Sequence, residues 1–404
     1  MGNESGLSKG QRTKQQILER ATQVFREDGF QNSSIVNIAA RIGITPASIY
    51  KYFDNKEAIY NELAVTFKNT MIANVTQAVD DRLDVSENIA NIVRAYVSTI
   101  RDNTALYDTF RQIEFVNLTL AQAYYRQLTG AIRACLDKRA RPDIDTETVA
   151  YAIVGSIYFV VIQSFLWGDG AGMVPEDIIP MVLNGIDARG DFVPYVLPRK
   201  RWVDPEKPAA TQGEVTRRNI LLAAEHLFGE NGYHKTHTTD IARASGVGLG
   251  TIYLYFDSKK EILAELVGRV NHLLRACSSE YARPYTDRRE IENAGFQAFF
   301  DVFEDRGEDY RIVREAEFVE KSVGVAYYQK IAEPYARGLE VATQRGEIID
   351  IHPLLLSYAL MGAGHTVGIR WYVIEKGQQL DDRAVLSMLQ YVMHGVRGIL
   401  KETE

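Results

Sequence analysis

The strongest constraint on this chain is that its second half repeats its first. Shifted by 203 residues, segment 13–63 aligns with 216–266 without a gap, and the two are identical at 19 of 51 positions. A later insertion changes the offset, so that YAIVG at 151–155 meets YALMG at 358–362. A unit of about 200 residues is therefore duplicated, and both copies must suit one architecture.

A proline-rich segment joins the two copies. Four of the eleven prolines lie between residues 190 and 213, together with the basic run at 199–201. This composition is typical of a semi-extended linker. The predicted domains are 10–63 and 64–189 in the first copy, the linker 190–213, and then 214–266 and 267–404 in the second copy.

Apolar spacing and helix-end signals predict an all-α fold. Residues 15–28 carry apolar side chains at helical spacing and end at Gly29. Ser34 and the pair Thr45-Pro46 have the chemistry of helix starts, and Gly43 permits a tight turn between them. The second copy repeats this plan, and no stretch shows sustained strand alternation.

One apolar segment has the composition of a membrane-spanning helix. Residues 149–167 carry no formal charge and are nearly long enough to cross a bilayer. Their counterpart, 354–374, contains His365 and Arg370, and an arginine in mid-span is expensive in lipid. Because both copies should occupy one environment, the two runs are predicted to be protein interface helices.

Charge and cysteine content limit the partners and the compartment. The net charge of −7 excludes a uniformly basic nucleic-acid coat but permits a local DNA-binding surface. Cys135 and Cys277 are too few for a disulfide framework, and the first residues show no apolar signal segment. We therefore expect a protein of the reducing cytoplasm.

Each copy contains the elements of a helix-turn-helix. Two short helices meet at Gly43 or Gly246, and the second helix of such a motif can enter the major groove of DNA. A small apolar core is available to fix the helix crossing, formed by Ile38, Ala39, Ile44 and Ile49 and by Ile241, Ala242, Val247 and Ile252.

The segments GITPASIYKYFDNKEAI (43–59) and GVGLGTIYLYFDSKKEIL (246–263) resemble the DNA-binding signature of the tetracycline-repressor (TetR) family. The resemblance covers both copies. It implies in each a three-helix DNA reader and a larger helical domain with a small-molecule pocket and half of a four-helix dimer interface. That interface is expected at 149–167 with 175–188, and at 354–374 with 382–400. Since one chain carries both copies, we expect an intramolecular pseudo-dimer, with further homodimerisation left open.

The resemblance also implies which residues contact double-stranded operator DNA. The expected set is Thr45, Ala47, Ser48, Tyr50, Lys51, Tyr52 and Lys56 in the first copy, and Thr238, Thr239, Gly250, Thr251, Tyr253, Leu254, Tyr255 and Lys259 in the second. Lys56 and Lys259 are expected to reach phosphates. Two departures weaken the pattern: Leu254 replaces a polar contact, and Ile35-Val36 stand where the second copy has Thr238-Thr239.

A repeated stripe in the larger domains is the candidate effector site. Its residues fall on one helical face and its flank: Tyr107, Arg111, Glu114 and Tyr125, repeated as Tyr310, Arg314, Glu317 and Tyr328. The same stripe is also compatible with a surface ion pair or with a buried pair that tethers two helices. Aromatic content favours an apolar effector, such as an acyl-CoA or another apolar metabolite.

Two sets of residues have the spacing of an enzyme motif or a metal site but lack the other features that such a site requires. The Tyr-x-x-x-Lys and Gly-x-Gly-x-Gly patterns lack a βαβ unit, so we expect no enzyme activity and no cofactor. His234 and His237 lack further ligands, so no metal site is expected. The sequence thus predicts a one-component DNA-binding regulator, most often a repressor in such a family. The alternative is a ligand-binding or scaffold protein that has lost specific DNA binding.

Overall fold

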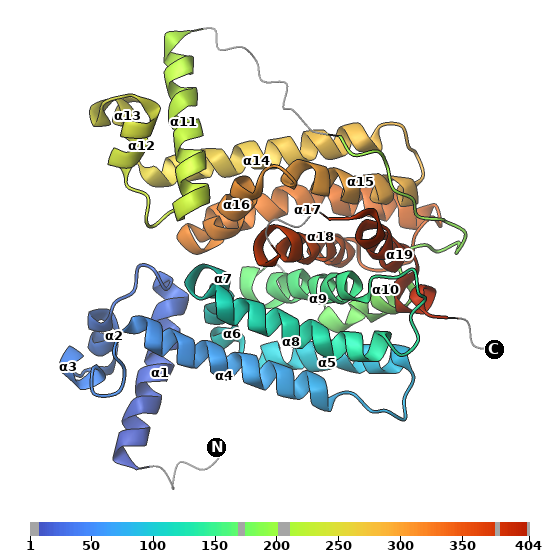
Figure 1. Cartoon of the computed structure of the whole chain (residues 1–404), viewed down its shortest axis with the longest axis horizontal. Helices are drawn as coiled ribbons and strands as arrows, with labels where there is room; N and C mark the ends of the chain where they lie inside the picture. The colour runs from blue at the N-terminus through green and yellow to red at the C-terminus, as the bar shows by residue number, and fades with distance from the viewer. Residues whose placement is uncertain (1–7, 169–173, 201–210, 376–379, 402–404) are drawn as a thin grey trace. The chain divides into compact units, whose positions relative to one another are not determined.

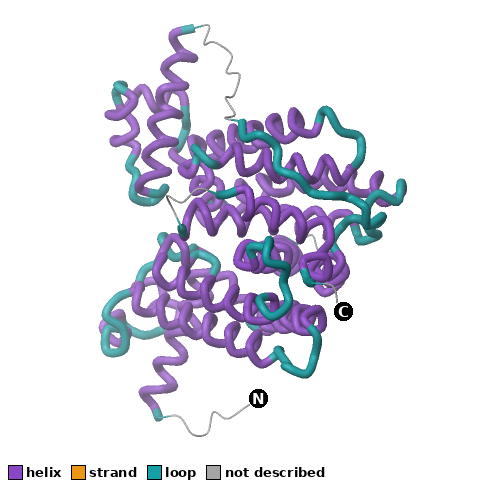
Figure 2. The backbone as a smooth tube through the Cα atoms, turned by 45° about the vertical axis from the view of Figure 1, so that its right-hand side comes forward, coloured by secondary structure: helices purple, strands orange, loops and turns teal. Residues whose placement is uncertain are grey.

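The computed structural model describes residues 8–168, 174–200, 211–375 and 380–401. Within them every regular element is a helix, and extended pairing is limited to two isolated bridges (Figure 2). The first copy contains α1 (Lys9–Asp28), α2 (Ile35–Ile42), α3 (Pro46–Ile49), α4 (Lys56–Gln77), α5 (Val85–Asp102), α6 (Thr104–Phe110), α7 (Ile113–Val116), α8 (Leu118–Leu136), α9 (Thr146–Ile162), η2 (Gln163–Trp167), η3 (Pro175–Ile178) and α10 (Ile179–Asn184) (Figure 1). The second copy contains α11 (Gln212–Asn231), α12 (Thr238–Ser245), α13 (Leu249–Tyr255), α14 (Lys259–Ala282), α15 (Arg288–Phe303), α16 (Gly307–Val319), α17 (Lys321–Gln344), α18 (Pro353–Ile369), η4 (Arg370–Ile374) and α19 (Asp382–Ile399). The all-α prediction is confirmed.

Local chemistry explains the helix ends. Ser8 begins α1 with a capping box to Gln11, so α1 starts earlier than the predicted residue 15. Ser34 caps α2 through the backbone N–H of Asn37. Gly43 ends α2 with φ 79°, a left-handed conformation that favours glycine. Gly246 does the same after α12, with φ 72°.

Contacts divide the chain into two compact units that do not follow the repeat. One unit holds the described residues up to Asp80 together with Arg94–Ala131. The other holds Asp81–Val93 and the described residues from Ile132 onward. The second unit therefore contains the second copy and also α9 and α10 of the first. The domain boundaries expected from the repeat remain predictions.

Within the second unit, α9 of the first copy packs along α18 of the second (Figure 1). Thr146–Trp167 has the length and mean hydropathy (2.0) of a membrane span, but 83% of its apolar window is buried inside the protein. Thr366 Oγ1 on α18 donates a hydrogen bond of 2.6 Å to the Tyr151 carbonyl on α9. The apolar residues of α9 are therefore buried against protein, as expected for an interface helix.

Pairs of equivalent glycines lie where the helices of the two copies cross. A Cβ on Gly155 would lie 2.0 Å from the Gly362 carbonyl oxygen, and a Cβ on Gly362 would lie 2.0 Å from that of Gly155. The helices α10 and α19 also pack against each other. There a Cβ on Gly185 would lie 2.1 Å from the Met393 oxygen, and one on Gly395 2.3 Å from the Leu183 carbonyl carbon. Gly185 (φ 72°, ψ −166°) and Gly395 (φ 63°, ψ −165°) share one backbone conformation, which identifies them as structural counterparts. Each position thus meets its own counterpart or that counterpart's neighbours, as positions near a two-fold axis do.

The first part of the predicted linker is held against the second copy. Asn293 on α15 exchanges hydrogen bonds with the Tyr195 backbone, at 3.3 Å from Tyr195 N–H and 3.0 Å to its carbonyl. The Lys200 N–H donates to Asp301 at 2.9 Å. Residues 201–210 of the linker lie outside the described residues.

Candidate nucleic-acid interface and effector region

The helix-turn-helix of each copy is built around the predicted small core. Ile38, Ala39 and Ile49 are buried between α2, α3 and their neighbours, and Ile241, Ala242 and Ile252 are buried in the second copy. Ile44 and Val247 are only half-buried. Because the inward positions are taken by these apolar side chains, the rest of α3 and α13 is left for solvent or a partner.

The predicted DNA-contact residues fall mostly on that outer face. In the first copy, Thr45, Ala47, Tyr50 and Lys51 are exposed and Ser48 and Tyr52 half-buried; in the second, Thr239, Gly250, Tyr253 and Leu254 are exposed and Thr238, Thr251 and Tyr255 half-buried. Leu254 is 81% exposed, so nearly its whole side chain is accessible to a partner. The Thr45 hydroxyl lies 3.0 Å from that of Ser48 instead of capping α3.

Lys56 and Lys259 donate hydrogen bonds to backbone carbonyls of the loop before the helix-turn-helix. Lys56 Nζ donates to the carbonyls of Phe30, Gln31 and Ser33 at 2.9, 3.2 and 3.1 Å. Lys259 Nζ donates to the equivalent loop, to Tyr233 and Thr236 at 2.8 Å each. Burial lowers the pKa of both ammonium groups. Each lysine thus fixes the loop before the helix-turn-helix. We infer a positioning role for both lysines, and their contact with DNA phosphates stays a prediction.

That role leads to a prediction for the salt dependence of DNA binding. We expect Lys56→Ala to destabilise the first reader by about 1–3 kcal/mol, because charge-assisted hydrogen bonds to three carbonyls are lost. Operator affinity should fall while the slope of log Kd against log salt stays unchanged, because no phosphate contact is removed. Lys51→Ala is the matched control, since its exposed cation should reduce that slope by about one charge. A unit loss of slope in Lys56→Ala would restore the phosphate role.

The same loop is tied to the larger domain in both copies. In the first, the Phe30 N–H donates to Gln112 Oε1 at 2.9 Å, and Gln112 Nε2 donates to the Phe25 carbonyl at 3.3 Å. In the second, Glu315 takes the place of Gln112 and accepts from the Tyr233 N–H at 3.1 Å. Burial raises the pKa of the Glu315 carboxyl, against the opposing effect of that N–H. Gln112 and Glu315 were not singled out from the sequence, although they hold equivalent positions in the repeat.

The first effector stripe is a buried polar cluster. Tyr107 is 1% exposed, and Arg111 pairs with Asp108 at 3.5 Å. Glu114 accepts a hydrogen bond from the Tyr125 hydroxyl at 2.8 Å. Burial raises the pKa of the neighbouring Tyr96 to about 12, while hydrogen bonds with Tyr107 and Tyr124 lower it. The stripe therefore points inward, and the surface ion-pair alternative is wrong for Arg111.

The second stripe is closed by residues from the first copy. Tyr310 donates to the His365 carbonyl at 2.7 Å, and burial lowers the pKa of Arg314 to about 10. Glu317 accepts a 2.7 Å hydrogen bond from the indole N–H of Trp167. The Trp167 ring stacks on Tyr328 with centroids 5.2 Å apart. Trp167 was not predicted as a site residue, because nothing in the sequence shows which helix end would face Glu317.

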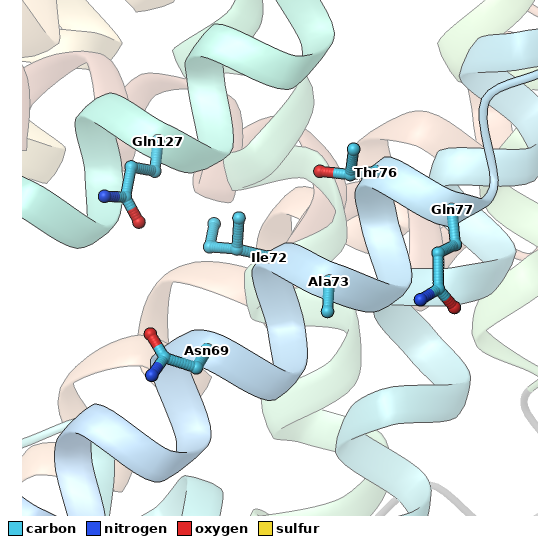
Figure 3. Close-up of a pocket in the computed structure, with 6 residues that line it drawn as sticks. All are labelled: Asn69, Ile72, Ala73, Thr76, Gln77 and Gln127. Carbon is cyan, nitrogen blue, oxygen red and sulfur yellow. The ribbon is translucent and has the colours of Figure 1, made fainter.

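A separate pocket of about 400 Å³ lies between α4 and α8. Its lining is formed by Asn69, Ile72, Ala73, Thr76, Gln77 and Gln127 (Figure 3). Most of these side chains are exposed, and none belongs to the predicted stripes. This pocket therefore does not coincide with the candidate effector site.

His234 and His237, which have possible metal-ligand spacing, take part in other local contacts. In the part of the chain that the structure describes, no group of three or more His, Cys, Asp or Glu side chains is arranged to hold a metal ion. The ring of His234 lies edge-on to that of Tyr233, with centroids 5.3 Å apart. His237 begins α12 as its N-cap residue.

Comparison with known proteins identifies the repeated unit. The sequence model of the family described as "Bacterial regulatory proteins, tetR family" matches residues 17–63 and again 220–266. The HTH-type transcriptional activator FasR of Mycolicibacterium smegmatis is 35% identical over 186 residues, which cover 45% of this chain and 84% of that protein. The HTH-type transcriptional repressor KstR2 of Rhodococcus jostii is 26% identical over 194 residues, covering 45% and 93%.

Two further similarities are narrower. A fatty acid metabolism regulator protein of Bacillus subtilis is 49% identical over 47 residues, which cover 12% of this chain and 24% of that protein. Among solved structures, a bacterial regulatory protein in the tetR family from Rhodococcus RHA1 aligns at 20% identity with a TM-score of 0.37, covering 43% of this chain and 92% of that chain.

Proposed function

Because the chain belongs to the tetR family of bacterial regulatory proteins, as two tandem copies, and is a DNA-binding transcriptional regulator, we propose that it acts as a covalent pseudo-dimer. In this proposal one polypeptide presents both α3 and α13 to a single operator. An ordinary relative needs two chains to supply two readers, whereas this chain already holds both.

The observation that carries the proposal is the crossing of equivalent glycines. In a symmetric dimer, residues on the two-fold axis contact their own copies. Gly155 and Gly362 hold the same place in the repeat, and each lies against the backbone of the other. The pair formed by α10 and α19 behaves alike at Gly185 and Gly395. The two copies therefore have the contact pattern of two subunits.

We further propose that a small, largely apolar effector regulates DNA binding. Two of the four residues in each stripe are buried tyrosines, and relatives include a regulator named for fatty acid metabolism. The helix α16 carries Arg314 and Glu317 together with Glu315, which holds the loop of the second reader. A ligand that moves α16 would thus shift α13. An acyl-CoA is one candidate effector.

Repression is the proposed outcome of DNA binding, because an operator that overlaps a promoter blocks polymerase. The alternative function is a ligand-binding or scaffold protein without specific DNA binding, and the exposed Leu254 in place of a polar reader residue favours it for the second copy. In both cases the proposed compartment is the cytoplasm, with no membrane, cofactor or metal involved. Further homodimerisation of the whole chain is compatible with either.

A gel-shift assay with the chain's own upstream DNA tests the function. We expect specific binding that weakens steeply between two salt concentrations, because phosphate contacts release counterions. The absence of binding to every upstream fragment at low salt would leave only the scaffold alternative.

The effector proposal makes a quantitative prediction. An effector that weakens operator binding by a given factor must itself bind more weakly to the operator complex, by the same factor. Small molecules that co-purify with the protein, identified by mass spectrometry, supply the test ligand. Its affinity is then measured by calorimetry with and without operator DNA. Equal affinities would show that the ligand does not regulate DNA binding.

A further inference from the structure

A charged contact joins the end of α18 to the start of α9, and it has no counterpart at the mirrored positions of the two copies. Arg370, at the end of α18, is 7% exposed, and its Nη1 donates to Thr148 Oγ1 at 2.6 Å and to Asp145 Oδ2 at 3.1 Å. Its Nη2 lies 3.6 Å from Glu147 Oε2. A cation of the second copy therefore lies on an acidic cluster at the start of α9 of the first copy.

The acidic cluster is also built into the helix start. Asp145 Oδ1 accepts the N–H groups of Glu147 and Thr148 at 3.1 and 3.4 Å, so it caps α9 while its other oxygen faces Arg370. Burial by itself lowers the pKa of Arg370, but the carboxylates of Asp145, Glu375 and Glu147 raise it above its usual value. Glu375 belongs to the second copy and contacts Arg370 Nε at 3.3 Å. The two Nη groups of the guanidinium are thus compensated only where the cluster at the start of α9 is present.

The mirrored position has different chemistry. With the offset that aligns 151–155 with 358–362, Arg370 corresponds to Gln163. The residues that correspond to Asp145, Glu147 and Thr148 are His352, Leu354 and Leu355. Gln163 is 1% exposed, and neither its amide oxygen nor its amide nitrogen has a hydrogen-bond partner among the described residues. At the positions that face the other copy, the second copy therefore offers a cation and no acid, and the first offers an acid and no cation.

We propose that Arg370 and its acidic cluster determine partner choice, so that a first half pairs with a second half and pairs of like halves are rejected. This inference rests on the proposed pairing of the halves. In a pair of second halves, each Arg370 would keep Glu375 but would face His352 and leucines in place of Asp145 and Glu147. A pair of first halves would leave Asp145 without its cation. Loss of charged partners by a buried ion is strongly unfavourable.

Partner choice has a consequence for assembly. If like halves paired, no chain could satisfy its interfaces alone. It would need a second chain that pairs through both halves, or different neighbours at its two halves, which would give open-ended polymers. Pairing of unlike halves permits closure within one chain, and an operator-binding unit made of one chain requires that closure.

The test uses the full-length chain with a protease site inserted between residues 205 and 206. The folded protein is cut, unfolded in urea and refolded, and native mass spectrometry then counts the three possible pairs. For the wild type we expect unlike pairs almost alone. For Arg370→Gln we expect a rise of at least tenfold in like pairs, toward the half that random pairing gives, because the buried charge that penalises them is gone.

The matched control is Arg383→Gln. Arg383 also crosses from the second copy to the first, but it donates to the backbone carbonyls of Pro142, Asp143 and Ile144, which every pairing offers. It should leave partner choice unchanged. Residues 190–200 stay on the first half after the cut and bias all variants alike, so the comparison isolates Arg370. Random pairing in the wild type, or equal like-pair fractions in wild type and Arg370→Gln, would overturn the proposal.

If the cut halves do not refold, thermal unfolding of the uncut chain provides the second test. The double variant Gln163→Arg/Arg370→Gln moves the cation from the second half to the first, where it faces no carboxylate of the second half. This variant should have a lower Tm than the wild type. Adding His352→Asp and Leu355→Thr should restore at least half of the loss, and no restoration would contradict charge-based pairing. Operator binding by the uncut wild type is scored separately, so failure of the proposed function and failure of partner choice are distinguishable.

Discussion

Replacing Gly155 with alanine is expected to separate the two halves of the pseudo-dimer. The added Cβ would lie 2.0 Å from the Gly362 carbonyl oxygen and 2.1 Å from Thr366 Oγ1, so α9 and α18 must move apart along their whole contact. Overpacking of this kind costs about 2–3 kcal/mol. In a unit of this size, that loss corresponds to a decrease of about 4–12 °C in Tm. Operator affinity should fall as well, because the two readers lose their fixed separation.

The same chemical change elsewhere provides the control. Gly130 lies on an exposed position of α8, and a Cβ there would meet nothing within 4 Å. Gly130→Ala should therefore be neutral or stabilise the helix by up to about 1 kcal/mol. Calorimetry and operator titration of both variants make the comparison. Equal behaviour of the two would mean that the glycine crossing does not hold the halves together.

The operator is expected to have unlike half-sites, because the two reading helices differ. Lys51 is exposed on α3 and can donate to guanine in the major groove, whereas its counterpart Leu254 on α13 offers only apolar contact, for instance with a thymine methyl. Lys51→Leu should relax base discrimination in one half-site by about 1–3 kcal/mol and leave the other unchanged. Selection from random DNA, followed by binding measurements on single-base variants, gives the readout.

The reciprocal variant sharpens that experiment. Leu254→Lys should give the second half-site a preference closer to that of the first, so that the selected operator becomes more palindromic. A perfect inverted repeat selected by the wild type would contradict unlike readers. That result would favour a complex in which two chains each contribute the same reading helix.

The fold and the readers could be predicted because their signals are local. Gly43, Ser34 and the apolar spacing act within a few residues, and the repeat presents each signal twice. The role of Lys56 could not be predicted, because it depends on carbonyls of residues 30–33, which only the folded loop brings to its ammonium. From the sequence alone, a lysine at the start of a helix suggests a phosphate contact, because the carbonyl acceptors of the loop are not yet known.

The interface required tertiary information for the same reason. The sequence predicts that 149–167 and 354–374 are interface helices, but not that Gly155 and Gly362 lie at their crossing. The residues that contact the effector stripes could not be predicted from the sequence either. Arg111 pairs with Asp108, and Glu317 pairs with Trp167, which is 150 residues away in sequence. Spacing along one helix shows which side chains share a face, but it does not show what that face meets.

The most direct test of the account is the stoichiometry of the operator complex. Sedimentation equilibrium of the purified chain with a DNA fragment that carries one selected operator gives the mass of the complex. We expect one chain per operator, with both half-sites protected in a footprint of the same complex. A complex that protects both half-sites only when two chains are bound would contradict it.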